Sequence, residues 1–512
     1  MKHFLSLLLI VLIFVLVGCS TSPTATATIS ISVIHDGQTD QILVPANSSV
    51  RQALTALSIT LNTLDRVEPE LESTLQNDAS IKVIRVTETY SVEEKTLPFE
   101  SQTVKNESMS AGQKVLIQAG VNGKQSITYR VLTEDGVEVS RTVTKTETIQ
   151  SSKPEIIMLG VQSSFKPVEI SGTIAYISSS NAWVMEANTG NRRSVVSTGD
   201  LDGRIFSISP DKKWLLFTRS AGSDESQTIN SLWIASLEDS GSQPISLGVK
   251  NVVNYAEWIP NKTNTIAYST VEFRSTAPGW QANNDLQVVQ FGKDGSVINS
   301  KTLLEANSGG IYGWWGTTFL WSPDNSEIAY ARPDSIGLVD TKSGTTNTLV
   351  EFTPYQTSGD WAWVPGIAWA DGHAVLYANL PDSDPSGTRY SLNGILIDQN
   401  FPVVLQANTG LFSYPSVSPD SNLVAYLTAL LPDQSESSSY NLFVMDRDGS
   451  NPKKLYPNEG GSGLEPQTVI WSPSSDNKIA FIANGNLLLI DPVTAAINQI
   501  TGDSSISKID WK

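Results

Sequence analysis

One pattern of apolar and polar positions recurs along residues 170–512. Each copy begins with an apolar strand and a turn of the Ser-Pro-Asp type. A second strand follows, which ends in a small or branched residue and an aromatic one. A third strand then leads through an Asp-Gly or Ser-Gly turn to a fourth. The turns lie at Ser209-Pro210-Asp211, Ile259-Pro260-Asn261, Ser322-Pro323-Asp324, Ala370-Asp371-Gly372, Ser418-Pro419-Asp420 and Ser472-Pro473-Ser474. Repeated copies of a four-stranded unit predict a β-propeller.

The two ends of this repeat predict how the ring closes. The first copy, residues 172–198, lacks an inner strand, and residues 506–511 form an inner strand with no successors. Pairing these two segments completes one blade with strands from both ends of the repeat. We predict seven blades, with six or eight as alternatives, because the turns at Ile259-Pro260-Asn261 and Ala370-Asp371-Gly372 depart from the pattern.

A second β-rich region precedes the propeller. Residues 29–44 alternate apolar and polar side chains around His35-Asp36-Gly37-Gln38, which predicts a hairpin. Ser48 or Ser49 can cap a short helix that carries Val50, Leu54 and Leu57 on one face, and residues 81–86 form the next strand. Residues 29–80 resemble the small ubiquitin-like domain that often precedes the G-five domain of bacterial surface proteins.

Residues 81–162 resemble the G-five domain itself, named for five glycines, which here are Gly112, Gly120, Gly123, Gly136 and Gly160. The strands at 126–132 and 137–146 have no continuous apolar face, so they predict an elongated sheet stabilised by backbone pairing. The resemblance implies cell-wall attachment, adhesion or contact with N-acetylglucosamine-type glycans. The alternative is a spacer that holds the next domain away from the membrane.

The N-terminal residues predict the cellular compartment. Lys2 is followed by a largely apolar run over residues 4–17 and then by Gly18 and Cys19, which indicates a secretory signal. Residues 16–19 resemble the bacterial lipobox, which implies a signal peptide over residues 1–19 and lipidation of Cys19. Residues 20–28 are expected to be a Ser/Thr tether. The resemblance thus implies an extracytoplasmic protein anchored to a bacterial membrane, whereas the alternatives are an ordinary secretory signal or a short membrane anchor.

Composition excludes several classes of chemistry. The formal net charge of −18 disfavours nucleic-acid binding. One cysteine allows no disulfide within the chain. His3 falls in the segment expected to be removed, so the mature chain cannot supply the three or four ligands of a His/Cys zinc site. No hydrolase elbow, phosphate loop or dinucleotide fingerprint occurs. We expect no cofactor and no metal: His35 and His373 are interpreted as turn residues, and the acidic stretches at 382–387 and 446–449 as solvated turns rather than calcium loops.

Aromatic residues give the best indication of a ligand site. Trp314, Trp315, Trp361 and Trp363 lie just ahead of inner strands in adjacent copies, where loops open onto one face of a propeller. Such side chains can stack on sugar rings or hold a peptide. Packing between blades is the alternative. Two long insertions, residues 271–285 and 431–440, could decorate the rim.

The repeat region, residues 170–512, resembles the TolB-like, WD-repeat-related propellers of bacterial envelope proteins. Its most similar segments are FSISPDKKWLLF and LWSPDNSEIAY. We therefore expect a mainly β, non-catalytic surface lipoprotein, whose stalk contacts cell wall or glycan and whose propeller binds a protein, peptide or glycan. The alternatives are a propeller enzyme acting on a wall or polysaccharide substrate at its pore, and a passive spacer. Convergent acids at the pore, one with a strongly raised pKa, would favour the enzyme.

Overall fold

The computed structural model describes residues 27–106, 109–161, 165–222, 227–239, 242–355, 357–358, 361–370, 373–383, 389–474 and 476–512. Cys19 and the tether up to residue 26 lie outside these residues. The chain divides into two compact units, the first comprising residues up to 96 with 124–150 and the second comprising 97–123 with 151–512. Within the described ranges, no helix is long and apolar enough to cross a membrane.

The first unit begins with a small sheet and one helix. Its strands β1 (Thr28–His35), β2 (Gln38–Pro45), β3 (Arg66–Glu68) and β4 (Ala79–Ile84) are arranged in the order β2-β1-β4-β3, with β1 parallel to β4. Helix α1 (Val50–Ala56) starts at Ser49, whose side chain and that of Gln52 form a reciprocal capping box. The expected hairpin and helix are therefore confirmed. Their apolar faces form one core that includes Val33, Ala53 and Ile81.

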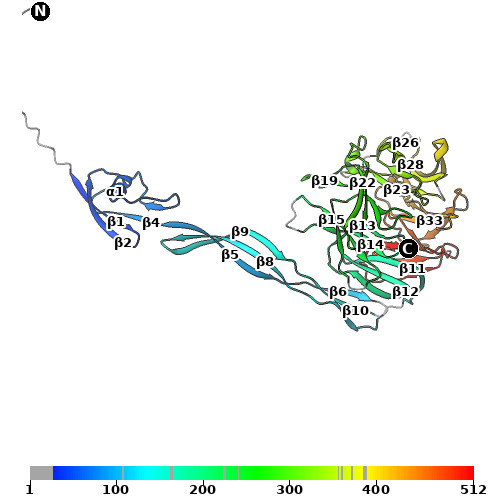
Figure 1. The fold of residues 1–512 in the computed structure, drawn as a ribbon, viewed down its shortest axis with the longest axis horizontal. Helices are drawn as coiled ribbons and strands as arrows, with labels where there is room; N and C mark the ends of the chain where they lie inside the picture. The colour runs from blue at the N-terminus through cyan, green and yellow to red at the C-terminus, as the bar shows by residue number, and fades with distance from the viewer. Residues whose placement is uncertain are drawn as a thin grey trace, which may run out of the picture. The chain divides into compact units, whose positions relative to one another are not determined.

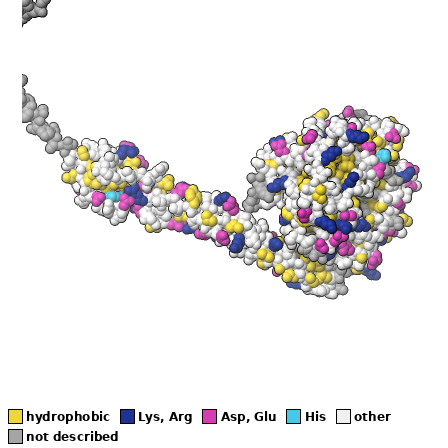
Figure 2. Space-filling model, viewed as in Figure 1, with side chains coloured by type: hydrophobic (Ala, Val, Ile, Leu, Met, Phe, Trp, Pro, Cys, Tyr) yellow, Lys and Arg dark blue, Asp and Glu magenta, His cyan; other side chains and the backbone are white. Residues whose placement is uncertain are grey.

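A long sheet follows in the same unit, made of β5 (Val86–Leu97), β8 (Gly123–Glu134) and β9 (Val137–Gln150) in the order β5-β8-β9. Strand β9 is exposed along almost its whole length, which confirms the absence of an apolar face. Cross-strand ion pairs join Arg130 to Glu88 and Arg141 to Glu93, each at 2.8 Å. Figure 2 shows charged side chains of both signs on its surface.

The second unit contains the repeat. A three-stranded sheet in the order β12-β11-β39 joins β11 (Glu169–Ser178) and β12 (Asn181–Val196) to β39 (Ile506–Trp511). In the described part of the repeat, six four-stranded sheets follow, each antiparallel and with its strands in chain order. Their strands are β13 (Leu201–Ile208), β14 (Trp214–Ser220), β15 (Asn230–Ser236), β16 (Ile245–Lys250); β17 (Ala256–Trp258), β18 (Thr265–Tyr268), β21 (Leu286–Phe291), β22 (Val297–Leu304); β23 (Thr318–Trp321), β24 (Ile328–Ala331), β25 (Ser335–Asp340), β26 (Thr345–Glu351); β27 (Ile367–Trp369), β28 (Val375–Pro381), β29 (Tyr390–Leu396), β30 (Phe401–Gln406); β31 (Ser416–Val417), β32 (Leu423–Ala429), β33 (Tyr440–Asp446), β34 (Lys453–Tyr456); and β35 (Ile470–Trp471), β36 (Ile479–Ala483), β37 (Asn486–Ile490), β38 (Ile497–Gln499).

Pairing between the two ends of the repeat closes the propeller. Strand β39 runs antiparallel to β11, with Trp511 opposite Ile174 and Ile509 opposite Tyr176. The Trp511 indole N–H also donates to the Ser171 carbonyl at 2.7 Å. Figure 1 accordingly shows the C-terminus beside β11. The expected closure by the C-terminal strand is confirmed.

The recurring tryptophan of the inner strand joins neighbouring sheets. The indole N–H of Trp258 donates to the Ser207 carbonyl at 3.1 Å, that of Trp369 to Leu320 at 3.0 Å, and that of Trp471 to Ser416 at 3.0 Å. Each acceptor carbonyl lies on the inner strand of the preceding sheet. It belongs to the residue just before the one that takes the tryptophan's place in that strand. The repeat therefore specifies contacts between blades as well as the strands within them.

A further sheet of the second unit lies outside the repeat. Strands β6 (Ser101–Asn106), β7 (Lys114–Gln118) and β10 (Glu155–Gly160) are arranged in the order β6-β10-β7. Ile156 and Met158 of β10 are buried in the same apolar cluster as Ile174 and Trp183 of the propeller. The sequence patterns predict one domain that ends at residue 162 and another that begins at residue 170. They do not predict that β10 and the propeller share a core.

Candidate functional site

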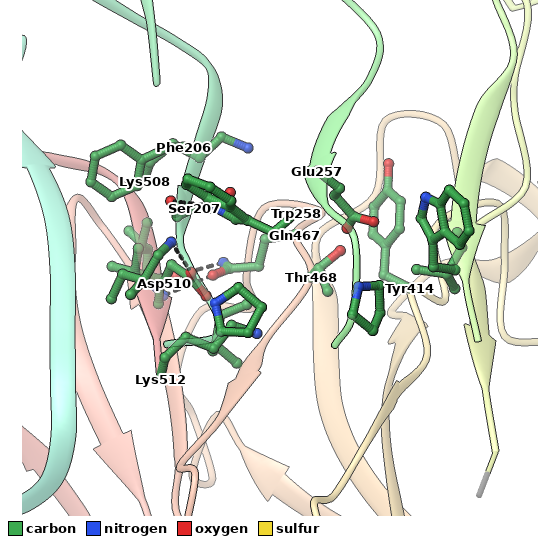
Figure 3. A pocket seen from close by; sticks show the side chains of 18 of the residues that line it. Phe206, Ser207, Glu257, Trp258, Tyr414, Gln467, Thr468, Lys508, Asp510 and Lys512 are labelled. Carbon is green, nitrogen blue, oxygen red and sulfur yellow. Dashed lines mark hydrogen bonds between the residues drawn. The ribbon is translucent and has the colours of Figure 1, made fainter. Parts of the chain in front are cut away.

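A cavity of about 850 Å³ lies among the inner strands of the propeller (Figure 3). Residues of β13, β17, β23, β35 and β39 line it, together with Tyr414 just before β31. Because several different sheets contribute, we call it the central channel. Its lining mixes aromatic residues, such as Trp258 and Trp321, with charged ones, which is typical of a ligand pocket.

Two acids line the channel, and they differ in their partners. The carboxylate of Asp510 accepts the backbone N–H of Ile208 at 2.6 Å and that of Trp511 at 2.9 Å. Glu257 has no hydrogen-bond or ion-pair partner among the residues that the structure places. Burial, with a smaller contribution from the negative charge of Asp510, raises the pKa of Glu257 to about 7, although Lys512 acts in the opposite direction.

This arrangement limits the chemistry of the channel. A carboxyl group with a pKa near 7 could exchange a proton at neutral pH. Glycoside hydrolysis ordinarily needs a second free carboxyl group, and Asp510 is already bound to two backbone N–H groups. The cavity lining therefore has one acid without a partner and one acid held by backbone N–H groups.

Trp314 and Trp315 lie in the short helix η1 (Gly313–Trp315), against the inserted hairpin of β19 (Val271–Phe273) and β20 (Trp280–Ala282). The Trp315 ring meets the Trp280 ring edge-on at 6.2 Å, and the Arg274 guanidinium lies 5.7 Å from the Trp314 ring centre. The Trp314 side chain remains 36% exposed. We call Phe273, Arg274, Trp280, Ile311, Trp314 and Trp315 the Trp314 surface.

Trp361 and Trp363 have different environments. Trp363 is only 1% exposed, and its indole N–H donates to the Leu411 carbonyl at 2.7 Å, so it packs in the core and presents no ring to a ligand. Trp361 is 38% exposed and stacks on Phe412 at 6.1 Å. The structure gives no contact between this pair and the Trp314 surface within its described part. A ligand role for Trp314, Trp315 and Trp361 stays a prediction.

A series of stacked aromatic rings extends from Trp361 to the central channel. Phe412 stacks in turn on Tyr414 at 5.8 Å, and Tyr414 lines the channel. Tyr414 has a φ of +38°, a conformation that bulky residues rarely adopt. Gly366 permits it, because a Cβ there would lie 2.9 Å from Cδ1 of Tyr414. Sequence reasoning missed both Tyr414 and Glu257.

His35, interpreted from the sequence as a turn residue, is the last residue of β1, and its ring nitrogens lie 3.0 Å from the carboxylates of Asp36 and Asp40. The remaining candidate residues form turns. His373 Nδ1 lies 2.9 Å from the Asp324 carboxylate, which joins the turns of adjacent sheets. The Asp448 carboxylate accepts from the Ser450 hydroxyl at 2.6 Å. Among the residues described, no group of three or more His, Cys, Asp or Glu side chains could hold a metal ion. The stretch at 382–387 lies partly outside those residues.

Comparison with known proteins identifies one domain. The family model described as "G5 domain" matches residues 88–162. "Resuscitation-promoting factor Rpf2" of Corynebacterium glutamicum is 29% identical over 158 residues, which are 31% of this chain and 41% of that protein. The chain thus spans about two fifths of the length of this curated relative.

Solved structures also resemble parts of the chain. TolB from Acinetobacter baumannii is 14% identical, with 73% of this chain and 98% of that chain covered and a TM-score of 0.34. The G5 domain of IgA1 protease is 22% identical, with 16% of this chain and 94% of that chain covered and a TM-score of 0.13. The chain is mainly β, its sheets form a propeller closed by the C-terminal strand, and residues 88–162 are a G5 domain.

Proposed function

We propose that this protein is a non-catalytic surface protein of the bacterial cell envelope, which contacts cell-wall glycan and presents a ligand-binding propeller. The G5 domain at residues 88–162 carries this proposal, because resemblance to that family implies contact with wall glycans. Similarity to Rpf2 over 158 residues supports it. The lipobox pattern at residues 16–19 supports attachment to the membrane through Cys19.

The Trp314 surface is the propeller's best candidate for contact with a glycan. An exposed indole face can stack on the C–H groups of a sugar ring at low entropic cost, since the ring has only two rotatable bonds. Trp280 holds Trp315 edge-on, and the Arg274 guanidinium lies beside Trp314. Its Nε and Nη2 groups donate to Gln281 and Glu272, so its Nη1 group is the donor left for sugar hydroxyls or acyl groups. The arrangement places apolar stacking next to hydrogen-bond donors.

We expect Trp314→Ala to weaken co-sedimentation of the full chain with insoluble peptidoglycan about tenfold, as for removal of an exposed aromatic anchor. Phe401→Ala is the matched control, because Phe401 is 61% exposed but lies on the outer strand β30. Unchanged pelleting of both variants would assign wall contact to the G5 region alone. Failure of the wild-type chain to pellet would contradict the proposal.

The lipid anchor has a separate test. We expect cells that express the wild-type chain to incorporate labelled palmitate into it, and the Cys19→Ala variant to show no label, because Cys19 is the only thiol in the sequence. Equal labelling of the two proteins would exclude lipidation at this residue.

The channel supports a second candidate function, because Glu257 has a pKa near neutrality. In this alternative the propeller acts on a wall or polysaccharide substrate, with Glu257 as the proton donor or acceptor. Release of soluble fragments from peptidoglycan by the wild type but not by Glu257→Gln would favour the enzyme. We regard binding as the better proposal because Asp510, the other channel acid, is held by backbone N–H groups.

A further inference from the structure

Each inner strand carries an equivalent residue one position before the recurring tryptophan, and five of the seven line the central channel. These residues are Ser207, Glu257, Leu320, Ala368, Ser416, Ile470 and Asp510. Only Glu257 and Asp510 are acids. Asp510 reaches the neighbouring inner strand and accepts the Ile208 N–H, whereas Glu257 has no partner in the described part of the chain. At equivalent positions of the repeat, the carboxylate of Asp510 is thus held by a hydrogen bond, whereas that of Glu257 has no partner among the described residues.

The contact between sheets beside Glu257 is also unusual. Tyr255, two residues before Glu257, is 5% exposed, and its hydroxyl lies beside the indole N–H of Trp321 on the next inner strand. At three other contacts between sheets, the equivalent indole donates to a backbone carbonyl. The contact between β17 and β23 thus departs from the repeat where Glu257 lies.

The channel also contains a cation without a partner. Lys508 of β39 lines the cavity and forms no hydrogen bond or ion pair with any residue described. Burial lowers the pKa of its ammonium group, as expected when no carboxylate compensates the charge. Figure 3 shows Lys508 and Glu257 at the same cavity but on different strands. Lys508 is exposed at the cavity, Glu257 is partly buried, and Lys512 also lines the cavity and lowers the pKa of Glu257. The cavity therefore presents an acid and cations without ion-pair partners in the described chain, which suits a ligand that carries both complementary charges.

We propose that the central channel binds a short zwitterionic peptide, with its ammonium group at Glu257 and its carboxylate at Lys508. A cavity of about 850 Å³ has room for a tripeptide. The rings of Trp258, Trp321 and Tyr414 in its wall suit an ammonium group and small apolar side chains. This inference does not depend on glycan contact at the Trp314 surface, which is a separate site.

The charge of Glu257 gives the site a pH dependence. The titratable groups that interact with Glu257 are Tyr255, just before β17, Asp510 of β39, and Lys512, just after β39. An ammonium group binds the ionised carboxylate, and the pKa of Glu257 is about 7 in the free protein. From pH 6 to pH 7.5 the ionised fraction of Glu257 rises about eightfold, while the protonated fraction of a peptide amine falls to about two thirds. Affinity should therefore rise about fivefold to sixfold.

The full chain should be titrated with trialanine, N-acetyl-trialanine and trialanine amide, with binding followed by calorimetry and by fluorescence of the channel tryptophans. We expect trialanine to bind at least tenfold more tightly than either blocked peptide. Equal affinity for all three, or no binding of trialanine at millimolar concentration, would overturn the proposal. Pelleting with peptidoglycan by the same preparation tests glycan contact separately, so failure of one proposal leaves the other measurable.

Two variants assign the charges. Glu257→Gln should weaken trialanine binding at least tenfold and remove the rise between pH 6 and pH 7.5. Lys508→Met should remove the preference for trialanine over its amide while the pH dependence remains. Glu351→Gln, at an exposed acid on the outer strand β26, is the control and should bind as the wild type. Wild-type affinity in both channel variants would exclude this site, and Lys508→Met alone suffices as the test if Glu257→Gln fails to fold.

Discussion

A chain that ends after Ser505 is expected to lose the cooperative unfolding transition of the propeller. The deletion removes β39, which pairs with β11 and places Ile506, Ile509 and Trp511 in the core. Burial of these three side chains contributes about 6–8 kcal/mol, which is comparable to the whole stability of an ordinary domain. The deletion also exposes an unpaired edge on β11, which favours aggregation. Near-ultraviolet circular dichroism, calorimetry and gel filtration of the truncated chain should show lost tertiary signal and larger species.

Two controls make this result specific to closure. Ser507→Ala changes an exposed side chain on the same strand and should leave the transition unchanged. A synthetic peptide of residues 505–512, added to the truncated chain, should pair with β11 and restore part of the tertiary signal. A truncated chain with the melting temperature of the full chain would show that the sheets hold together without the C-terminal strand.

The closure could be predicted from the sequence because it depends on local pattern. Residues 172–198 read as strands without an inner partner, and residues 506–511 read as an inner strand alone. The hairpin around Asp36-Gly37 and the helix cap at Ser49 were predictable for the same reason, since turn and cap residues act within a few positions of the chain.

The environments of Trp314, Trp315, Trp361 and Trp363 could not be predicted from local sequence pattern. Trp361 and Trp363 are two residues apart in one loop, yet the first is 38% exposed and the second 1%. The difference arises because Trp363 donates a hydrogen bond to the Leu411 carbonyl and packs edge-on against the Tyr390 ring. Both of these residues are distant from Trp363 in the sequence. Glu257 was visible only by comparing repeat copies, as an acid where most copies have a small or apolar residue. Its lack of a partner depends on the tertiary structure.

The shared core of β10 and the propeller was equally hidden from sequence reasoning. The alternation of Glu155–Gly160 indicates a strand with one buried face but not which surface covers that face. In the structure, Ile156 and Met158 pack in one cluster with Ile174, Trp183 and Trp511. Gln118 of β7 also donates to the Ser197 carbonyl at 3.0 Å, next to the end of β12. This sheet of the G5 region is therefore part of the propeller's folding unit.

Ile156→Ala is accordingly expected to lower the free energy of unfolding of the propeller by about 2–5 kcal/mol, the usual cost of removing a fully buried isoleucine side chain. Ile156 is 0% exposed, and its cavity would open beside Ile174 and Trp183, so the loss should appear in the propeller's own transition. Denaturant unfolding followed by tryptophan fluorescence measures it, because every tryptophan lies at or beyond residue 183. Ile149→Ala, at a residue that is 55% exposed in the first unit, should change this transition by less than about 0.5 kcal/mol. If Ile156→Ala leaves the fluorescence transition in place, the propeller folds independently of β10, and the G5 region would be a separate support.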